Sequence, residues 1–309
     1  MSQQAAPAPP RRDLPRRPLP NSPCIGTCTI DEATSLCLGC ARTGEEVAAW
    51  REAEPAYHAA VWAELPERAA RLGLTFRRLG WEPPEILGFV AETLGQSRGT
   101  WVLGVPGAVG EVMRAPDEPL EIRRSDEEIE AITPRAALRL KAPRGTRAFE
   151  WQEAAHMPAR IVLGLPRARL GAPDPAVLTA LGPDAEALLP GGKGQPRYDL
   201  GLGRAEARFT IRTGNAALAG LLDEATGQDW PAYLADIGQA VMAASPVRVV
   251  ETPLGRAEVA TPIPAPGATS PPGPHTHLLP GVLASGQAHP PLLPMPPAFA
   301  AAAIFYPSG

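Results

Sequence analysis

The chain has 309 residues, which is enough for about two domains, and its hydrophobic content of 44% is sufficient for an ordinary core. A net charge of -4 and a sequence pI near 5.8 argue against a protein that binds nucleic acid or anionic membranes over its whole surface, because such proteins usually carry a basic excess. We therefore expect its partner to be a protein or a small molecule.

Apolar runs in the chain are short. The longest, residues 298–305, falls well below the ~20 residues of a membrane-spanning helix. The basic residues are nearly all arginine, and alanine and proline are abundant, a bias typical of a GC-rich bacterial genome. The sequence thus predicts a bacterial, cytoplasmic protein with no membrane-spanning segment.

Residues 1–21 are rich in proline, alanine and arginine, and no apolar segment of the kind found in a secretory or twin-arginine signal follows their arginine pairs. We expect a disordered leader. A nucleic-acid-binding arm is the alternative, but four arginines in a short stretch support it only weakly.

The four cysteines of the chain lie in one short stretch, Cys24, Cys28, Cys37 and Cys40, in a C-x3-C-x8-C-x2-C arrangement. Disulfides would need an oxidising compartment, and the sequence shows no secretory signal. The two close pairs therefore favour a metal centre with four thiolate ligands in a module that spans residues 22–75.

Four thiolates suit either tetrahedral zinc or an iron-sulfur cluster. The C-x2-C-x2-C run of bacterial ferredoxins is absent. Pairs with the C-x2-4-C spacing of zinc knuckles are present, although the loop between them is shorter than usual. The spacing alone leaves both metals open.

Helical signals follow the last cysteine directly. Thr43 and Glu46 fit a capping box, which predicts a short helix with an apolar pair at Val47 and Trp50. A second apolar stripe follows Pro55, and Pro66 is expected to open a separate last turn. The module is thus predicted to be a metal loop followed by two or three short helices.

Residues 76–84 are interpreted as a linker and residues 85–309 as a larger domain of unknown function that ends in a proline-rich segment. Strand patterns are expected at residues 100–105, 109–113, 136–141, 147–151, 160–165, 207–212, 247–251 and 256–261. Helical patterns are expected at residues 84–94, 175–181, 184–189, 216–225 and 231–244. This order predicts an α+β domain with a mainly antiparallel sheet rather than a doubly wound parallel sheet.

The segments SPCIGTC, ATSLCLGCARTGEEVAAW and ELPERAARL resemble the small bacterial family DUF1289, a predicted iron-sulfur protein, over about residues 22–72. The resemblance implies a metal centre at the four cysteines and no established reaction. The segments TWVLGVPGAVGEV and RAEVATPIPAPGATSPPGPHTHLLPGVLASGQAH are similar to an uncharacterised proteobacterial domain, from which no functional residues carry over.

Three histidines in the proline-rich segment, His275, His277 and His289, form a possible second metal site, since His275 and His277 would point to the same side of an extended chain. The alternative is a rigid wrap whose histidines bond to the backbone. Nothing in the spacing fixes a metal geometry.

Three further patterns are weaker. The G-x-S-x-G string at residues 95–99 is not preceded by a strand and followed by a helix, as the nucleophile elbow of a serine hydrolase requires. The GGKG string at residues 191–194 lacks the preceding strand, the spacing and the Ser or Thr after lysine that a phosphate-binding loop requires. The charge run at Glu127, Glu128 and Glu130 is interpreted as a solvated face.

Two functions remain open from the sequence. One is a metal-binding accessory protein whose centre stabilises a small module that could not build a core unaided. The other is a redox enzyme or electron-transfer component in which an iron-sulfur centre serves a site near the histidines. The sequence does not decide whether the protein is an enzyme.

Overall fold

The computed structural model describes residues 22–154, 156–171, 176–229, 232–268, 276–286, 293 and 295–308. The expected leader, residues 1–21, lies outside this range. The helices are α1 (Gly44–Ala49), α2 (Pro55–Arg71), α3 (Pro83–Gly95), α4 (Ala216–Glu224), α5 (Leu234–Ala244) and α6 (Leu279–Ser285), with 3-10 turns η1 (Arg167–Arg169) and η2 (Thr276–Leu278). None of the described helices is long and apolar enough to cross a membrane.

The strands form two sheets in which the paired strands run antiparallel. The six-stranded sheet has the order β1 (Phe76–Arg78), β7 (Arg147–Trp151), β8 (Arg160–Pro166), β14 (Phe299–Pro307), β2 (Gly99–Val105) and β3 (Ala108–Met113). The eight-stranded sheet has the order β4 (Glu121–Arg124), β5 (Glu128–Ile132), β6 (Ala136–Lys141), β13 (Gly255–Val259), β12 (Val247–Thr252), β11 (Arg208–Arg212), β10 (Pro196–Asp199) and β9 (Thr179–Pro183). The predicted α+β class with antiparallel strands is confirmed, and the strands divide into two sheets.

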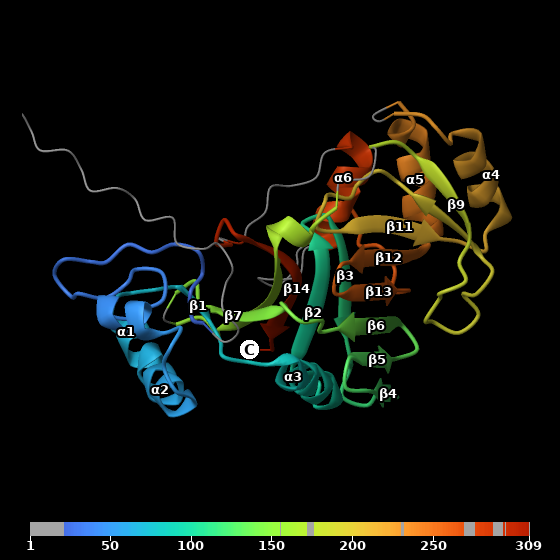
Figure 1. Ribbon diagram of the computed structural model, residues 1–309. Coiled ribbons are helices and arrows are strands. Elements are labelled where there is room, and N and C mark those ends of the chain that lie inside the picture. Colours follow the sequence, from blue (N-terminus) through green and yellow to red (C-terminus); the bar gives the residue numbers. More distant parts are fainter. Residues whose placement is uncertain are drawn as a thin grey trace, which may run out of the picture.

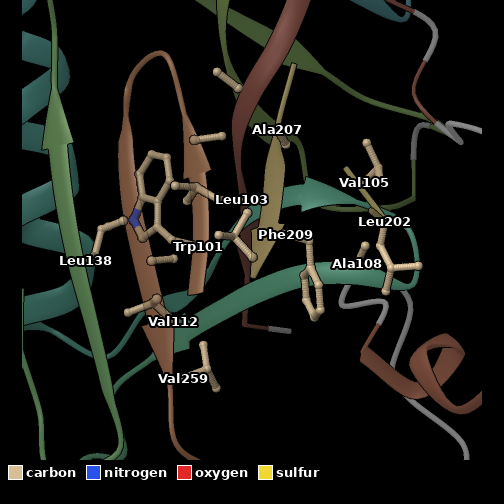
Figure 2. Close-up of a cluster of buried hydrophobic side chains, with 14 of the residues drawn as sticks. Trp101, Leu103, Val105, Ala108, Val112, Leu138, Leu202, Ala207, Phe209 and Val259 are labelled. Atoms are coloured by element: carbon tan, nitrogen blue, oxygen red, sulfur yellow. The ribbon is translucent and has the colours of Figure 1, made fainter. Parts of the chain in front are cut away.

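The β2–β3 hairpin packs across the middle of the eight-stranded sheet (Figure 1). Glycine makes this close approach possible, because a Cβ atom at Gly110 would lie 2.9 Å from the Cβ of Ala257. The main core fills the space between the two sheets, where Trp101, Leu103 and Phe209 are among the buried side chains (Figure 2). The helix α3 packs against β2 and β5, and α4, α5 and α6 gather at the β9–β11 end of the eight-stranded sheet (Figure 1).

The other face of the six-stranded sheet carries a second apolar cluster of Phe149, Trp151, Val162 and Phe299. The side chain of Ile25, next to Cys24, packs against this cluster. The cysteine module therefore lies on a sheet face that strand alternation makes apolar. Figure 1 shows α1 and α2 beside β1 and β7, at the opposite end of the molecule from α4.

The segment 76–84, expected as a linker, begins with β1. Phe76 is paired with Trp151 and Arg78 with Phe149, so the chain enters the large sheet immediately after the module. The Phe76 and Phe149 rings lie 5.1 Å apart.

Two predicted helices are wrong. The segment 175–181 contains the start of β9, and residues 184–189 form turns and loop. In the second segment the backbone N–H groups of Leu188 and Leu189 donate to the carboxylate of Glu258, at 2.9 and 3.1 Å. Because these donors serve a tertiary contact, the helical preference of the segment is overridden.

Pro66 does not open a separate turn, because α2 continues through it from Pro55 to Arg71. Its neighbours hold the helix in place: Leu65 and Ala69 are buried in the module core with Trp50, and Arg68 pairs with Glu46 of α1 at 2.7 Å. Tertiary packing thus outweighs the loss of one backbone hydrogen bond.

Candidate metal centre

The four cysteines lie on a short hairpin at the start of the described chain. Residues Ile30 and Cys37 form an antiparallel bridge, and so do Leu36 and Thr43. The loop between the two cysteine pairs is closed by Asp31, whose carboxylate accepts hydrogen bonds from the N–H and hydroxyl of Thr34 at 2.9 and 2.6 Å. The hairpin brings the second pair of cysteines back towards the first.

A tight turn positions Cys37 and Cys40. The N–H groups of Cys40 and Ala41 both donate to the carbonyl of Cys37, at 3.3 and 2.7 Å. Within the turn, a Cβ atom at Gly39 would lie 2.3 Å from the carbonyl oxygen of Thr27. Only glycine allows this approach, which fixes the turn against the loop that carries Cys24 and Cys28.

The thiols influence one another's ionisation. The pKa of Cys37 is lowered to about 5, chiefly because the Cys40 thiol donates a hydrogen bond to it; burial opposes this shift and nearby backbone N–H groups add to it. The same hydrogen bond, followed by burial, raises the pKa of Cys40. Burial raises the pKa of Cys28, and the neighbouring Cys37 adds to that shift. The Cys37 thiolate therefore forms easily, whereas a cation must displace the protons of Cys28 and Cys40.

The hairpin as it stands is not a closed metal cage. Across the described residues, no group of three or more His, Cys, Asp or Glu side chains has the arrangement that would hold a metal ion. The sulfurs approach in pairs, Cys28 with Cys37 and Cys37 with Cys40, through S–H···S hydrogen bonds. Coordination at about 2.3 Å would replace those bonds, and the exposed position of Cys28 leaves it room to move.

The surroundings of the sulfurs fit a metal–thiolate centre. The N–H of Gly26 donates to Cys24 Sγ at 3.4 Å, and Arg42 Nε donates to Cys40 Sγ at 3.4 Å. Donors of this kind stabilise thiolate and tune the metal that it binds. Arg42 is 3% exposed, and its Nη1 atom has no hydrogen-bond partner. Arg42 is thus a buried positive charge next to the Cys40 thiol, with one N–H group unused, and such a residue would stabilise a negatively charged metal–thiolate centre.

The short helix α1 anchors this arrangement. The predicted capping box is confirmed: Thr43 accepts from the N–H of Glu46 at 3.1 Å, and the Glu46 carboxylate accepts from the N–H of Thr43 at 2.9 Å. The guanidinium of Arg42 stacks on Trp50, with its carbon 4.6 Å from the ring centroid. The chain that follows Cys40 is thereby held against the module core.

The predicted histidine site is described only in part. His277 lies in η2, and His275 and His289 lie outside the described residues. In the described chain, the N–H of the neighbouring Thr276 donates to the Glu111 carboxylate at 2.6 Å, which ties this turn to β3. The second metal site stays a prediction.

The G-x-S-x-G and GGKG strings do not have the structural surroundings of catalytic loops. Gly95 ends α3, and β2 begins at Gly99, so a helix precedes and a strand follows the G-x-S-x-G string. At the GGKG string, a Cβ atom on Gly192 would lie 2.5 Å from Nη2 of Arg212. This glycine therefore makes room for a buried arginine.

Sequence reasoning missed the basic residues near the thiols. Arg42 follows Cys40 by two residues, and this proximity was a usable signal. Arg78 carried none, because its contact with Ser22 depends on the pairing of β1 with β7.

The fold and the cysteine hairpin define a class: an α+β protein of two antiparallel sheets that carries a small four-cysteine helical module. Residues 22–69 match a family described as a protein of unknown function (DUF1289), and residues 85–309 match a family of unknown function (DUF6925). The chain belongs to the DUF6925 family and has a DUF1289 segment before it. No curated protein and no solved structure matches the chain.

Proposed function

We propose that the protein is a cytoplasmic metal-binding accessory protein, with one zinc ion or iron-sulfur cluster held by Cys24, Cys28, Cys37 and Cys40. One observation carries the proposal: all four thiols lie on one hairpin, where backbone and guanidinium N–H groups donate to sulfur. The DUF1289 match over the same residues is compatible with it.

The roles of the residues follow from their positions. The pKa of Cys37 is lowered to about 5, so this thiol is available as a ligand at neutral pH. Gly39 keeps the second pair close to the first, and Arg42 supplies positive charge at Cys40. When bound, the metal would supply cross-links that a module of this size cannot obtain from its small core of Ala41, Trp50, Val61, Leu65 and Ala69.

The proposed partner is a protein or a small molecule, because the net charge of -4 gives no basic excess for nucleic acid. Electron transfer is the second candidate, and the exposure of Cys28 favours it. A ligand at the surface, next to the exposed side chains of Ile30 and Leu38, would place the centre within reach of a redox partner.

Metal analysis of anaerobically purified full-length protein tests the proposal. We expect either about one zinc per chain and no visible absorption, or iron with acid-labile sulfide and thiolate charge-transfer absorption. A colourless zinc protein would exclude the electron-transfer candidate. Protein that holds no metal, and whose four thiols stay reactive to a thiol reagent in the presence of added Zn2+, would contradict the metal function itself.

Single substitutions sharpen this test. Cys37→Ser and Cys40→Ser remove buried ligands and should each abolish stoichiometric metal. Leu38→Ala is the matched control, because Leu38 lies in the same turn with its side chain 43% exposed. Equal metal loss in Leu38→Ala would mean that the turn, rather than the thiols, is what the metal analysis reports.

A further inference from the structure

The loop that carries Cys24 forms part of the contact between the module and the six-stranded sheet. Ile25 packs on the Phe149 and Phe299 cluster, and a Cβ atom at Gly26 would lie 3.0 Å from the Cβ of Ala298. The two residues that follow the first thiol therefore lie against the large domain, so a shift of the Cys24 loop would alter this docking contact.

Two arginines hold Ser22, two residues before Cys24, from opposite sides of this contact. Arg42, from the module, donates from Nη2 to the Ser22 hydroxyl at 3.4 Å. Arg78, from β1 of the sheet, donates from Nη1 to the Ser22 carbonyl. A third arginine, Arg147 of β7, lies on the same sheet face as Arg78 and is half-buried.

Carboxylates act on these guanidiniums only from beyond ion-pair distance, Glu46 on Arg42 and Glu82 on Arg78 and Arg147. Arg42 and Arg78 are 3% and 4% exposed, and within the described chain none of the three arginines makes an ion pair. Arg42 Nη1, Arg78 Nε and Arg147 Nε are buried without hydrogen-bond partners. Burial, followed by the neighbouring charge of Arg147, lowers the pKa of Arg78 to about 9, and Cys24 and Glu82 act in the opposite direction.

Buried charges without partners are costly, and a ligand that supplies the missing charge would offset this cost. Four thiolates around one divalent metal leave a net charge of about -2. An occupied centre at the cysteine hairpin would therefore provide the charge that Arg42 and Arg78 lack.

We propose that the occupied metal centre is the counter-ion of Arg42 and Arg78, and that Arg78 thereby couples metal loading to docking of the cysteine module on the six-stranded sheet. This inference rests on the proposed metal function. It assigns Arg78 a positioning role, since Arg78 reaches the centre through Ser22.

The proposal predicts that Arg78→Met stabilises the metal-free protein but weakens metal binding. In metal-free protein, Arg78→Met removes an uncompensated buried charge and should raise the midpoint of thermal unfolding. In loaded protein it removes the counter-charge of the centre and should weaken Zn2+ binding about 10- to 100-fold, the range usual for partners outside the ligand set. A purely structural arginine would not give this reversal.

The experiment uses the full-length chain stripped of metal, with Zn2+ alone as the probe. Zn2+ affinity is measured by competition with a chelating dye, and the unfolding midpoint is measured without metal. Arg77→Met is the matched control: Arg77 neighbours Arg78 on β1 and is already paired with Glu150 at 2.8 Å. It should leave Zn2+ affinity within about twofold and should not raise the metal-free midpoint.

Arg78→Lys separates charge from packing. It keeps the charge and should retain most of the Zn2+ affinity that Arg78→Met loses. The inference is overturned if Arg78→Met binds Zn2+ like wild type, if its metal-free form is less stable than wild type, or if Arg78→Lys loses as much affinity as Arg78→Met. Failure of the wild-type chain to bind any metal would instead overturn the proposed function, so the two failures are distinguishable.

Discussion

Buried arginines occur in two contrasting settings in this molecule. On the eight-stranded sheet, Arg212 and Arg256 share the carboxylates of Asp184 and Glu258, with Arg212 at 2.8 and 2.6 Å from the two acids and Arg256 at 2.8 Å from Glu258. At the cysteine hairpin, Arg42 and Arg78 are just as buried but reach only hydroxyl, carbonyl and sulfur atoms.

The difference lies in the counter-charges that the protein itself supplies. In the first group each guanidinium forms ion pairs with at least two carboxylates, and both acids also accept backbone N–H groups. The second group has no ion pair within the described residues. Burial without an ion pair does not by itself mark a ligand site, because Arg248 of β12 is equally buried, has two donors without a partner and lies away from the cysteines. What sets Arg42 and Arg78 apart is their position beside the cysteine hairpin.

Breaking the complete network should give the largest effect. Glu258→Gln removes a fully buried carboxylate that serves both arginines, and should lower the free energy of unfolding by about 3–5 kcal/mol. Chemical denaturation of the variant measures this loss. Glu92→Gln, at an exposed pair with Arg98, is the control and should cost no more than about 1 kcal/mol. A similar small loss for both variants would contradict the contrast between the two settings.

The cysteine hairpin should be the next most sensitive. Gly39→Ala would place a methyl group 2.3 Å from the Thr27 carbonyl, so the loop must shift at a cost of about 1–3 kcal/mol and the two cysteine pairs must separate. We expect a clear loss of bound metal by elemental analysis. Gly44→Ala, where the added Cβ atom meets nothing within 4 Å, should keep its metal. Full metal content in Gly39→Ala would show that the turn does not set the ligand geometry.

Acid should weaken the complete network progressively. Burial alone would raise the pKa of Glu258, but the hydrogen bond and charge of Arg212 outweigh it and the net pKa is lowered; Asp184 behaves in the same way. A folded-state pKa below the unfolded value means that this stability is present above about pH 4 and is lost as the pH falls further. Thermal unfolding between pH 7 and pH 3 should show this fall. It should be shallower in Glu258→Gln, and an equal slope in both would argue against the lowered pKa.

Arg147→Met should give the smallest change. Arg147 is half-buried, donates to the carbonyl of Thr146 at 2.9 Å and does not contact Ser22. Because this guanidinium is only half-buried, we expect its removal to raise the free energy of unfolding of the metal-free protein by no more than about 0.5 kcal/mol, and the Zn2+ affinity to stay within about twofold. Affinity loss equal to that of Arg78→Met would mean that net positive charge, and not contact with Ser22, supports the centre.

Local signals in the sequence were sufficient for much of the fold. The strands at residues 136–141 and 147–151 were predicted with the bounds that the structure gives them, because apolar and charged residues alternate in both and aromatic residues mark the second. The charge run at Glu128 and Glu130 forms β5, where these side chains pair with Lys141 and Arg139 while Ile129 faces the core. Only Glu127 has the solvated position that was expected of this run; Glu128 and Glu130 are half-buried in ion pairs, and the strand itself was missed.

Long-range contacts account for what the sequence did not reveal. The turn structure of residues 184–189 depends on Glu258, which lies far away in the chain. The cysteine positions and the α1 cap are readable because their partners are local, whereas the role of Arg78 depends on the registration of β1 with β7. Contacts between segments far apart in the chain, such as the β1–β7 pairing, cannot be inferred from the local pattern of a single sequence.

The placement of β14 has a consequence for biosynthesis. This strand lies between β8 and β2 and is the last of the described elements to be synthesised, so the six-stranded sheet cannot be completed on the ribosome before residues 299–307 emerge. Phe299 also belongs to the surface on which Ile25 rests. The cysteine hairpin, which is synthesised long before Phe299, therefore gains this part of its docking surface only after β14 has joined the sheet.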